Sequence, residues 1–172
     1  MKGVNNMPLP IGYMYQEKAL GAGTVGTVQH YNIEHVPAGT DVNYGVAIKI
    51  QDQAGVVADK APIFGITTKR GYAMGDDYSA IEDDHWYKGE DMGVLTEGAI
   101  SVPITADVNR LDLAAINADG TFKPAGAGDT AVGHFLTAGD KDSTAIVYVN
   151  LTSVNTTATV TPDVSGAGKW GK

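Results

Sequence analysis

The chain has 172 residues, of which 43% are hydrophobic, with 12 Lys and Arg against 20 Asp and Glu and no Cys. This length allows one domain to close a hydrophobic core, and the composition is that of a folded protein. A net charge of −8 argues against nucleic acid or an anionic membrane surface as a partner. The lack of Cys excludes disulfides, thiolate metal sites and cysteine nucleophiles.

The residue types that branch at Cβ dominate the composition. The chain contains 17 Val, 11 Ile and 16 Thr but only 7 Leu. Branched side chains fit a pleated sheet and lose rotamer freedom in a helix. We therefore predict an all-β fold, a small β-barrel or β-sandwich with an extended N-terminal arm and a flexible C-terminal tail.

Residues 1–27 are predicted to form the N-terminal arm. Two prolines and five glycines interrupt regular structure there. Residues 21–26 match the letters of the dinucleotide-binding fingerprint, but a strand-like sequence follows instead of a helix, so we interpret them as a flexible hinge. The arm either binds a partner or packs on its own domain, and its apolar anchors are Ile11, Tyr13, Met14 and Tyr15.

Residues 28–161 are predicted to form the β domain. Turn-forming sequences recur about every dozen residues, which is typical of a sandwich or small barrel. The candidate strands are 28–35, 44–50, 63–69, 92–97, 99–105, 110–117, 132–137 and 144–151. The segment 145–151 is apolar on both faces, so we expect a central strand with Val147 and Val149 buried and Tyr148 at least half buried on the other face.

Two segments at the C-terminal side are less regular. Residues 106–119 suit either a helix capped by Asp107 or a strand that turns at Asp119-Gly120 and returns through Phe122. We favour the strand. After a weak strand at 157–161, residues 162–172 are predicted to be a flexible tail.

An acidic segment, residues 76–91, is the densest group of charges in the chain. Its carboxylates suit either a divalent cation or, as we favour, a solvated loop. Trp86 and Tyr87 suggest an aromatic patch that faces a sugar or a protein, or else aromatic side chains that cap the edge of the core. No spacing of residues nominates a catalytic, cofactor-binding or metal site, so no enzyme activity and no cofactor are predicted.

Several short sequence segments, taken in their order along the chain, resemble those of the capsid cement (decoration, or head auxiliary) proteins of tailed bacteriophages. After the Gly- and Pro-containing arm, the segments are Tyr-Gly-Val-Ala-Ile-Lys-Ile at 44–50, Ile-Phe-Gly-Ile-Thr-Thr at 63–68, the strand pair within 92–104, Asp-Gly-Thr-Phe at 119–122 and Ala-Val-Gly-His-Phe-Leu at 131–136. The resemblance covers roughly residues 1–151. The acidic loop 76–91 and the Thr-rich tail depart from it.

The resemblance implies a structural virion protein that binds the outer surface of a phage capsid and stabilises the expanded shell. Its partner would be the major capsid protein, with no nucleic acid or membrane partner. It would form a homo-oligomer, a trimer, and lie on the capsid exterior after synthesis in the host cytoplasm. Two other classes stay open, namely a carbohydrate- or receptor-binding β-sandwich module of a virion, with a platform built from Trp86 and Tyr87, and an enzyme, which requires a deep pocket with convergent titratable groups.

Overall fold

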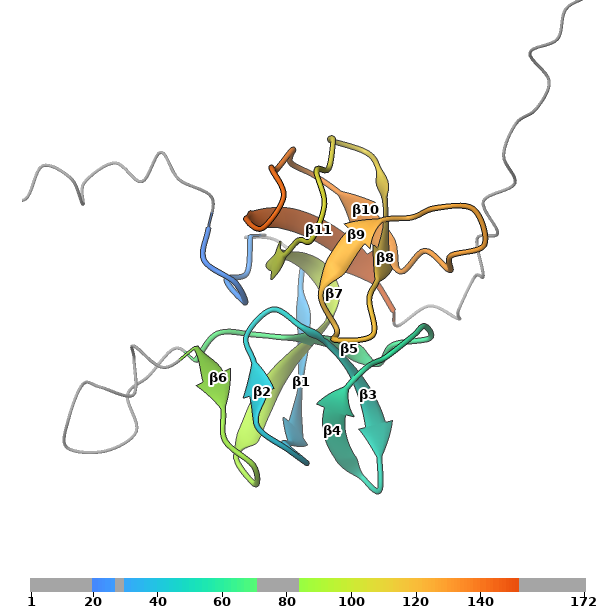
Figure 1. The fold of residues 1–172 in the computed structure, drawn as a ribbon. Coiled ribbons are helices and arrows are strands. Elements are labelled where there is room, and N and C mark those ends of the chain that lie inside the picture. Colours follow the sequence, from blue (N-terminus) through green and yellow to red (C-terminus); the bar gives the residue numbers. More distant parts are fainter. Residues whose placement is uncertain (1–19, 27–29, 71–83, 152–172) are drawn as a thin grey trace, which may run out of the picture.

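The computed structural model describes residues 20–26, 30–70 and 84–151. Within these residues the chain forms eleven strands and no helix, which confirms the all-β prediction (Figure 1). The strands are β1 (Asn32–Pro37), β2 (Val42–Asn43), β3 (Ala47–Gln51), β4 (Ala54–Val57), β5 (Gly65–Thr67), β6 (His85–Trp86), β7 (Asp91–Pro103), β8 (Leu113–Ile116), β9 (Phe122–Pro124), β10 (Gly133–Phe135) and β11 (Thr144–Asn150).

One long strand, β7, organises the molecule. Figure 1 shows it running from a lower group of strands (β1 to β6) to an upper group (β8 to β11), which we call the lower and upper lobes. The sequence pattern predicted two strands here, 92–97 and 99–105, separated at Gly98. They are one strand of 13 residues, with Gly98 at a φ of +129°. Because neighbouring strands pair with β7 on both sides of Gly98, the ladder continues through this residue.

The lower lobe is a curled antiparallel sheet. β1 and β5 pair with opposite edges of the first half of β7, and β3 and β4 extend the sheet beyond β5. A parallel bridge between Ala38 and Gly55 brings the end of β1 against β4, so the strands nearly close on themselves. The short pair β2 and β6 lies beside them. One cluster of buried residues in this lobe consists of Val36, Ala38, Val42, Tyr44, Val46, Ile48, Trp86, Met92 and Val94.

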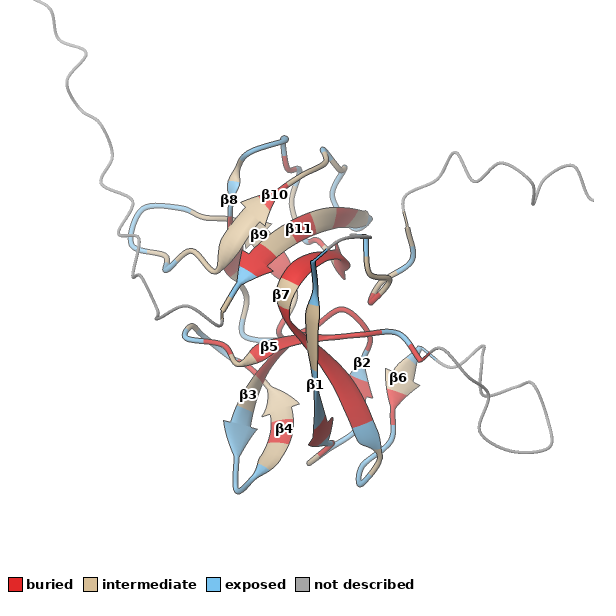
Figure 2. Cartoon of the chain, turned by 180° about the vertical axis from the view of Figure 1, so that it is seen from behind, coloured by how far each residue is buried: buried red, intermediate tan, exposed pale blue. Residues whose placement is uncertain are grey.

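The upper lobe repeats this arrangement with the second half of β7. The order is β7-β11-β10-β8-β9, and a bridge between Ile104 and Phe122 returns β9 to the end of β7. Its core contains Phe122 and Phe135 and continues through Leu95 into Ala47 and Ile66 of the lower lobe. Figure 2 shows the buried residues following β7 through both lobes. The cluster of the upper lobe therefore reaches into the lower lobe, which also has a cluster of its own.

Two predictions for the C-terminal half are confirmed, whereas the weak strand at 157–161 and the tail 162–172 lie outside the described residues. β11 lies between β7 and β10, with Val147 and Val149 fully buried and Tyr148 half-buried on the other face. The ambiguous segment 106–119 contains β8, and the chain returns through β9 at Phe122, as the strand interpretation expects.

The turn at residues 52–55 is shorter than the sequence indicated. Only Asp52 and Gln53 form it, with φ of 51° and 64°, and β4 starts at Ala54. Two consecutive positive φ values are those of a type I′ hairpin turn, which matches the twist of the strands it joins. The pairing of β2 with β6 was also missed, because two-residue strands show no periodicity. The proposed division at residues 27 and 161 falls outside the described residues and stays a prediction.

Candidate functional site

The end of the N-terminal arm is part of the sheet. Residues 20–26, which we call the arm base, lie along the second half of β7 on the edge opposite β11. The Gly26 amide donates to the Ala99 carbonyl at 2.7 Å, the Ser101 amide donates to Thr24 at 2.9 Å, and the Gly23 amide donates to Ser101 at 2.8 Å. Val25 bridges Ile100 in antiparallel register. This segment was predicted to be a flexible hinge, but backbone hydrogen bonds hold it on β7.

Two hydroxyl groups fix the point at which the arm enters the described structure. The carbonyl oxygen of Leu20 accepts hydrogen bonds from Ser101 Oγ at 2.5 Å and from Thr144 Oγ1 at 2.8 Å. Ser101 belongs to β7 and Thr144 to β11, so both central strands of the upper lobe bind the same carbonyl. The start of the arm base is thereby tied to two paired strands of the upper lobe.

A positive φ at Gly23 lets three segments meet beside β7. The φ of Gly23 is +76°, and a Cβ atom there would lie 2.7 Å from the Lys69 amide nitrogen and 2.9 Å from Tyr44 Cβ. The Lys69 amide itself donates to the Gly23 carbonyl at 2.7 Å. A side chain at residue 23 would therefore separate the arm base from the lower lobe. The arm base contacts both lobes because this position is glycine.

The predicted anchors Ile11, Tyr13, Met14 and Tyr15 lie outside the described residues, so their role stays a prediction. Their position along the chain is informative, since Tyr15 precedes Leu20 by five residues. Five extended residues span at most about 17 Å. This limit applies to Tyr15 alone, since Ile11 precedes Leu20 by nine residues and could reach about 31 Å.

An ion pair joins the two sides of the acidic segment. Arg70 Nη2 donates to Glu90 Oε2, and the Arg70 side chain is only 2% exposed. The guanidinium carbon lies 4.7 Å from the centroid of the Trp86 ring, a cation–π arrangement. Glu90 also accepts from the Tyr87 amide at 2.8 Å. The chain before residue 71 and the chain after residue 83 are thus held together. Residues 76–83 themselves lie outside the described residues.

Trp86 does not form the exposed aromatic platform that a sugar-binding module would need. It is 4% exposed, its Nε1 donates to the Thr68 carbonyl at 2.8 Å, and its ring meets that of Tyr44 edge-on at 5.9 Å. Tyr87 is 44% exposed and packs against His85. Of the two interpretations of this pair, the one in which the aromatic side chains cap the core is confirmed for Trp86.

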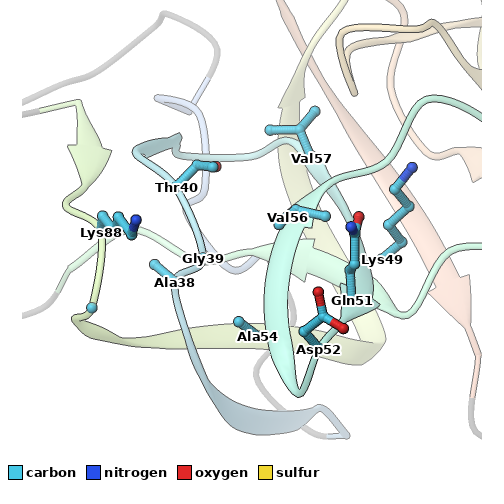
Figure 3. A pocket seen from close by; sticks show the side chains of 11 residues that line it. Ala38, Gly39, Thr40, Lys49, Gln51, Asp52, Ala54, Val56, Val57 and Lys88 are labelled. Atoms are coloured by element: carbon cyan, nitrogen blue, oxygen red, sulfur yellow. The ribbon is translucent and has the colours of Figure 1, made fainter.

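The lower lobe carries an open groove of about 680 Å³ (Figure 3). Val56 and Val57 of β4 lie on one side, and Gly39 and Thr40, which follow β1, lie across from them. Lys49 on its rim is paired with Asp59 through a 2.6 Å contact. An open groove with an ion-paired rim suits a shallow surface contact, whereas the enzyme alternative needs an enclosed pocket.

The carboxylates with shifted pKa values have local surface causes. Hydrogen bonds from Lys49, His85, Thr121 and Lys123 are the largest causes that lower the pKa of Asp59, Asp84, Asp119 and Asp129, respectively. Across the described ranges, no group of three or more His, Cys, Asp or Glu could hold a metal ion. A search of the same ranges for a helix long and apolar enough to cross a membrane finds none.

Comparison with known proteins identifies the class. The family of phage structural cement proteins (E217 gp24/Pam3 gp6) matches residues 10–152, and the chain belongs to that family. Membership makes it a structural protein of the virion, which confirms the resemblance noted in the sequence, and the family is not one of enzymes. The matched range begins just before the four predicted anchors.

One solved structure supports the fold, and a second is a weaker match. A chain of "The capsid of Myoviridae Phage XM1" superposes with a TM-score of 0.62 at 17% identity, covering 81% of this chain and 96% of that one. The head fiber gp8.5 N base of bacteriophage phi29 aligns with a TM-score of 0.46 at 13% identity, covering 73% of this chain and 99% of that one. No curated protein sequence matches the chain.

Proposed function

We propose that this protein binds the outer surface of a phage capsid, in contact with the major capsid protein, and stabilises the expanded shell. The observation that carries the proposal is the arm base. It is hydrogen-bonded along β7 and held at Leu20 by side chains of two central strands. A force applied to a bound arm would therefore pass directly into the sheet of the domain. This coupling is what a protein that ties shell subunits together requires.

The arm supplies the contact with the shell in this proposal. Ile11, Tyr13, Met14 and Tyr15 are apolar anchors, and burying each in a pocket of the shell would contribute about 1.5–3 kcal/mol before ordering costs. Contacts made through the arm would extend the binding surface beyond the domain. Many copies on one shell make modest individual contacts sufficient.

Stabilisation follows from selective binding. A ligand that binds the expanded shell and not the unexpanded one shifts the equilibrium toward the expanded state. The chain would be made in the host cytoplasm and would add to the capsid exterior. We further propose that it acts as a homotrimer, because a three-armed unit fits a junction at which several capsomers meet.

Truncation of the arm tests this function. Leu20 must stay, since its carbonyl accepts two hydrogen bonds, so the deletion removes residues 1–19. We expect the truncated protein to unfold at nearly the wild-type temperature and to lose most of its binding to expanded shells that lack the protein. Removal of residues 153–172, a deletion of similar size at the other end, is the matched control. Full retention of binding by the 1–19 deletion would reject the role of the arm, and failure of the wild-type protein to bind expanded shells would reject the function.

A further inference from the structure

A row of side chains crosses the outside of the upper lobe. The strand register places Leu113 of β8 opposite His134 of β10, and His134 opposite Tyr148 of β11. On each strand the residue next to the row is fully buried on at least one side, namely Ala114 on β8, Phe135 on β10 and Val147 on β11. Because side chains alternate along a strand, the row must face outward. Leu113 is 39% exposed, His134 and Tyr148 are half-buried, and their two rings lie 5.6 Å apart.

Leu111, two residues before Leu113, is also exposed and has an unusual conformation. It is 71% exposed and has a φ of +76°. Bulky residues avoid this region of the backbone, where glycine or asparagine is usual. The turn around it is nevertheless well fixed. The Leu111 amide donates to the Phe135 carbonyl at 2.8 Å, and the Asn109 amide donates to the Asp112 carboxylate at 2.8 Å.

Both features of Leu111 lower the stability of the isolated protein. An exposed leucine loses the benefit of burial, and its backbone conformation is strained. Strained residues concentrate at sites of function, because the surrounding structure holds them there for a purpose other than stability. A rigid turn that presents leucine to solvent is suited to insert that side chain into a partner.

The row leads directly to the arm base. Tyr148 lies opposite Ala99 of β7, and the Ala99 carbonyl accepts the hydrogen bond of the Gly26 amide. Leu113, His134, Tyr148 and Ala99 therefore occupy successive strands, and the arm base follows. With about 4.8 Å between strands, Leu113 lies only about 14 Å across the sheet from Ala99. A partner bound to the arm would therefore lie close to this row of side chains.

We propose that Leu111, Leu113, His134 and Tyr148, the docking patch, form a second contact with the shell, against an apolar hollow in the surface of the major capsid protein. This inference rests on the proposed function. The four side chains carry no carboxylate, but Asp112 lies between Leu111 and Leu113. Its carboxylate accepts the hydrogen bond of the Asn109 amide, and this bond lowers the cost of desolvating it in a contact made by the two leucines.

The size of the patch favours the shell over a second copy of the chain. The patch consists of only four side chains, whereas a standard interface takes about 20–30 residues from each partner. A stable interface between free proteins needs about 800 Å² on each partner. A contact this small is useful when the arm already holds the partner nearby, because tethering raises the effective concentration.

Leu111→Gly separates binding from folding. Glycine adopts this φ without strain, so the variant should unfold at the wild-type temperature or above, while its affinity for expanded shells should fall about tenfold, or about 1.4 kcal/mol. Ile50→Thr is the matched control, since Ile50 is 43% exposed on β3 of the lower lobe, away from the patch. It should bind shells like the wild type. Leu113→Thr should weaken binding in the same direction as Leu111→Gly.

Three outcomes would overturn the inference. The first is wild-type shell affinity for both Leu111→Gly and Leu113→Thr when the 1–19 deletion loses binding, in which case the proposed function stands. The second is a loss of shell affinity in Ile50→Thr as large as that in Leu111→Gly. The third is a change in molar mass of free Leu111→Gly by light scattering, which would assign the patch to contact between copies. Failure of the wild-type protein to bind would instead reject the proposed function.

Discussion

Gly45 and Gly23 cross at backbone contact distance, since a Cβ atom on Gly45 would lie 2.8 Å from the amide nitrogen of Gly23. Their φ values are +75° and +76°. This crossing joins the arm base to the lower lobe, although Gly23 pairs with β7 in the upper lobe. It shows how the arm can be part of the sheet without being a strand of its own.

Replacing Gly45 by Ala should lower the free energy of unfolding by about 1–3 kcal/mol, because the methyl group meets backbone atoms that cannot move away independently. Thermal or urea unfolding measures the effect. Gly128→Ala is the control, since Gly128 has a φ of +89° with nothing within 4 Å of its Cβ position, so only backbone strain changes. An equal decrease in the free energy of unfolding of the two variants would contradict the importance of the close contact at Gly45.

Arg70→Met should lower the free energy of unfolding by about 3 kcal/mol, because it leaves Glu90 without its charged partner and removes the guanidinium from the Trp86 ring. Chemical unfolding followed by Trp fluorescence measures this. Lys49→Met breaks an exposed ion pair with Asp59 and should change stability little. If Arg70→Met and Lys49→Met lower the free energy of unfolding by the same amount, the burial of the Arg70 pair does not add to stability.

The stability of the turn at Asp119 should depend on pH. Hydrogen bonding from Thr121 lowers the pKa of Asp119 below its ordinary value of 3.8, so folding favours the ionised carboxylate. This contribution is complete above the unfolded-state pKa and is lost as the pH falls through the folded-state pKa. Asp119→Asn should therefore be less stable than the wild type at pH 7, by no more than about 1 kcal/mol after solvent screening.

The two proteins should approach equal stability in acid, below the folded-state pKa of Asp119. Thermal unfolding from pH 7 to pH 2 tests this. Thr121→Val removes the hydroxyl donor instead of the charge and should reduce the pH dependence in the same range. A stability difference between wild type and Asp119→Asn that stayed constant across the whole range would contradict the assignment.

A trimer should have a mass of about 54 kDa, three times the 17.9 kDa of the chain. Light scattering of the free protein at micromolar concentration tests the proposal in solution. Counting the copies at each binding site tests it on shells. Monomer in solution together with single copies on the shell would contradict it. Monomer in solution with threefold clusters on the shell would mean that the shell itself drives assembly.

The role of the arm was only partly accessible from the sequence. Its apolar anchors are recognisable because Tyr and Met stand out between prolines and glycines, but whether they bind the shell stays a prediction. The arm base was misjudged, since glycine-rich sequence usually indicates flexibility. Its hydrogen-bond partners, Ala99 and Ser101, lie more than seventy residues further along the chain, and no local pattern reports such pairing.

The docking patch was beyond sequence reasoning for the same reason. Leu113, His134 and Tyr148 come from three separate strands, and only the register of the sheet aligns them. Leu111 looked like one more apolar residue of a helix or strand. Its positive φ and its exposure follow from hydrogen bonds to β10, which are a tertiary feature.

The sequence by itself determined the all-β class, the central position of β11 and the return of the chain through Phe122, because branched residues, unbroken apolar runs and turn-forming residues act locally. Tertiary structure decided that residues 91–103 are one strand, that Trp86 is buried and that the arm base completes an edge of β7. These features depend on which distant backbone groups meet. The local sequence does not determine which carbonyl a backbone amide pairs with, so the packing of the whole chain selects the pairing.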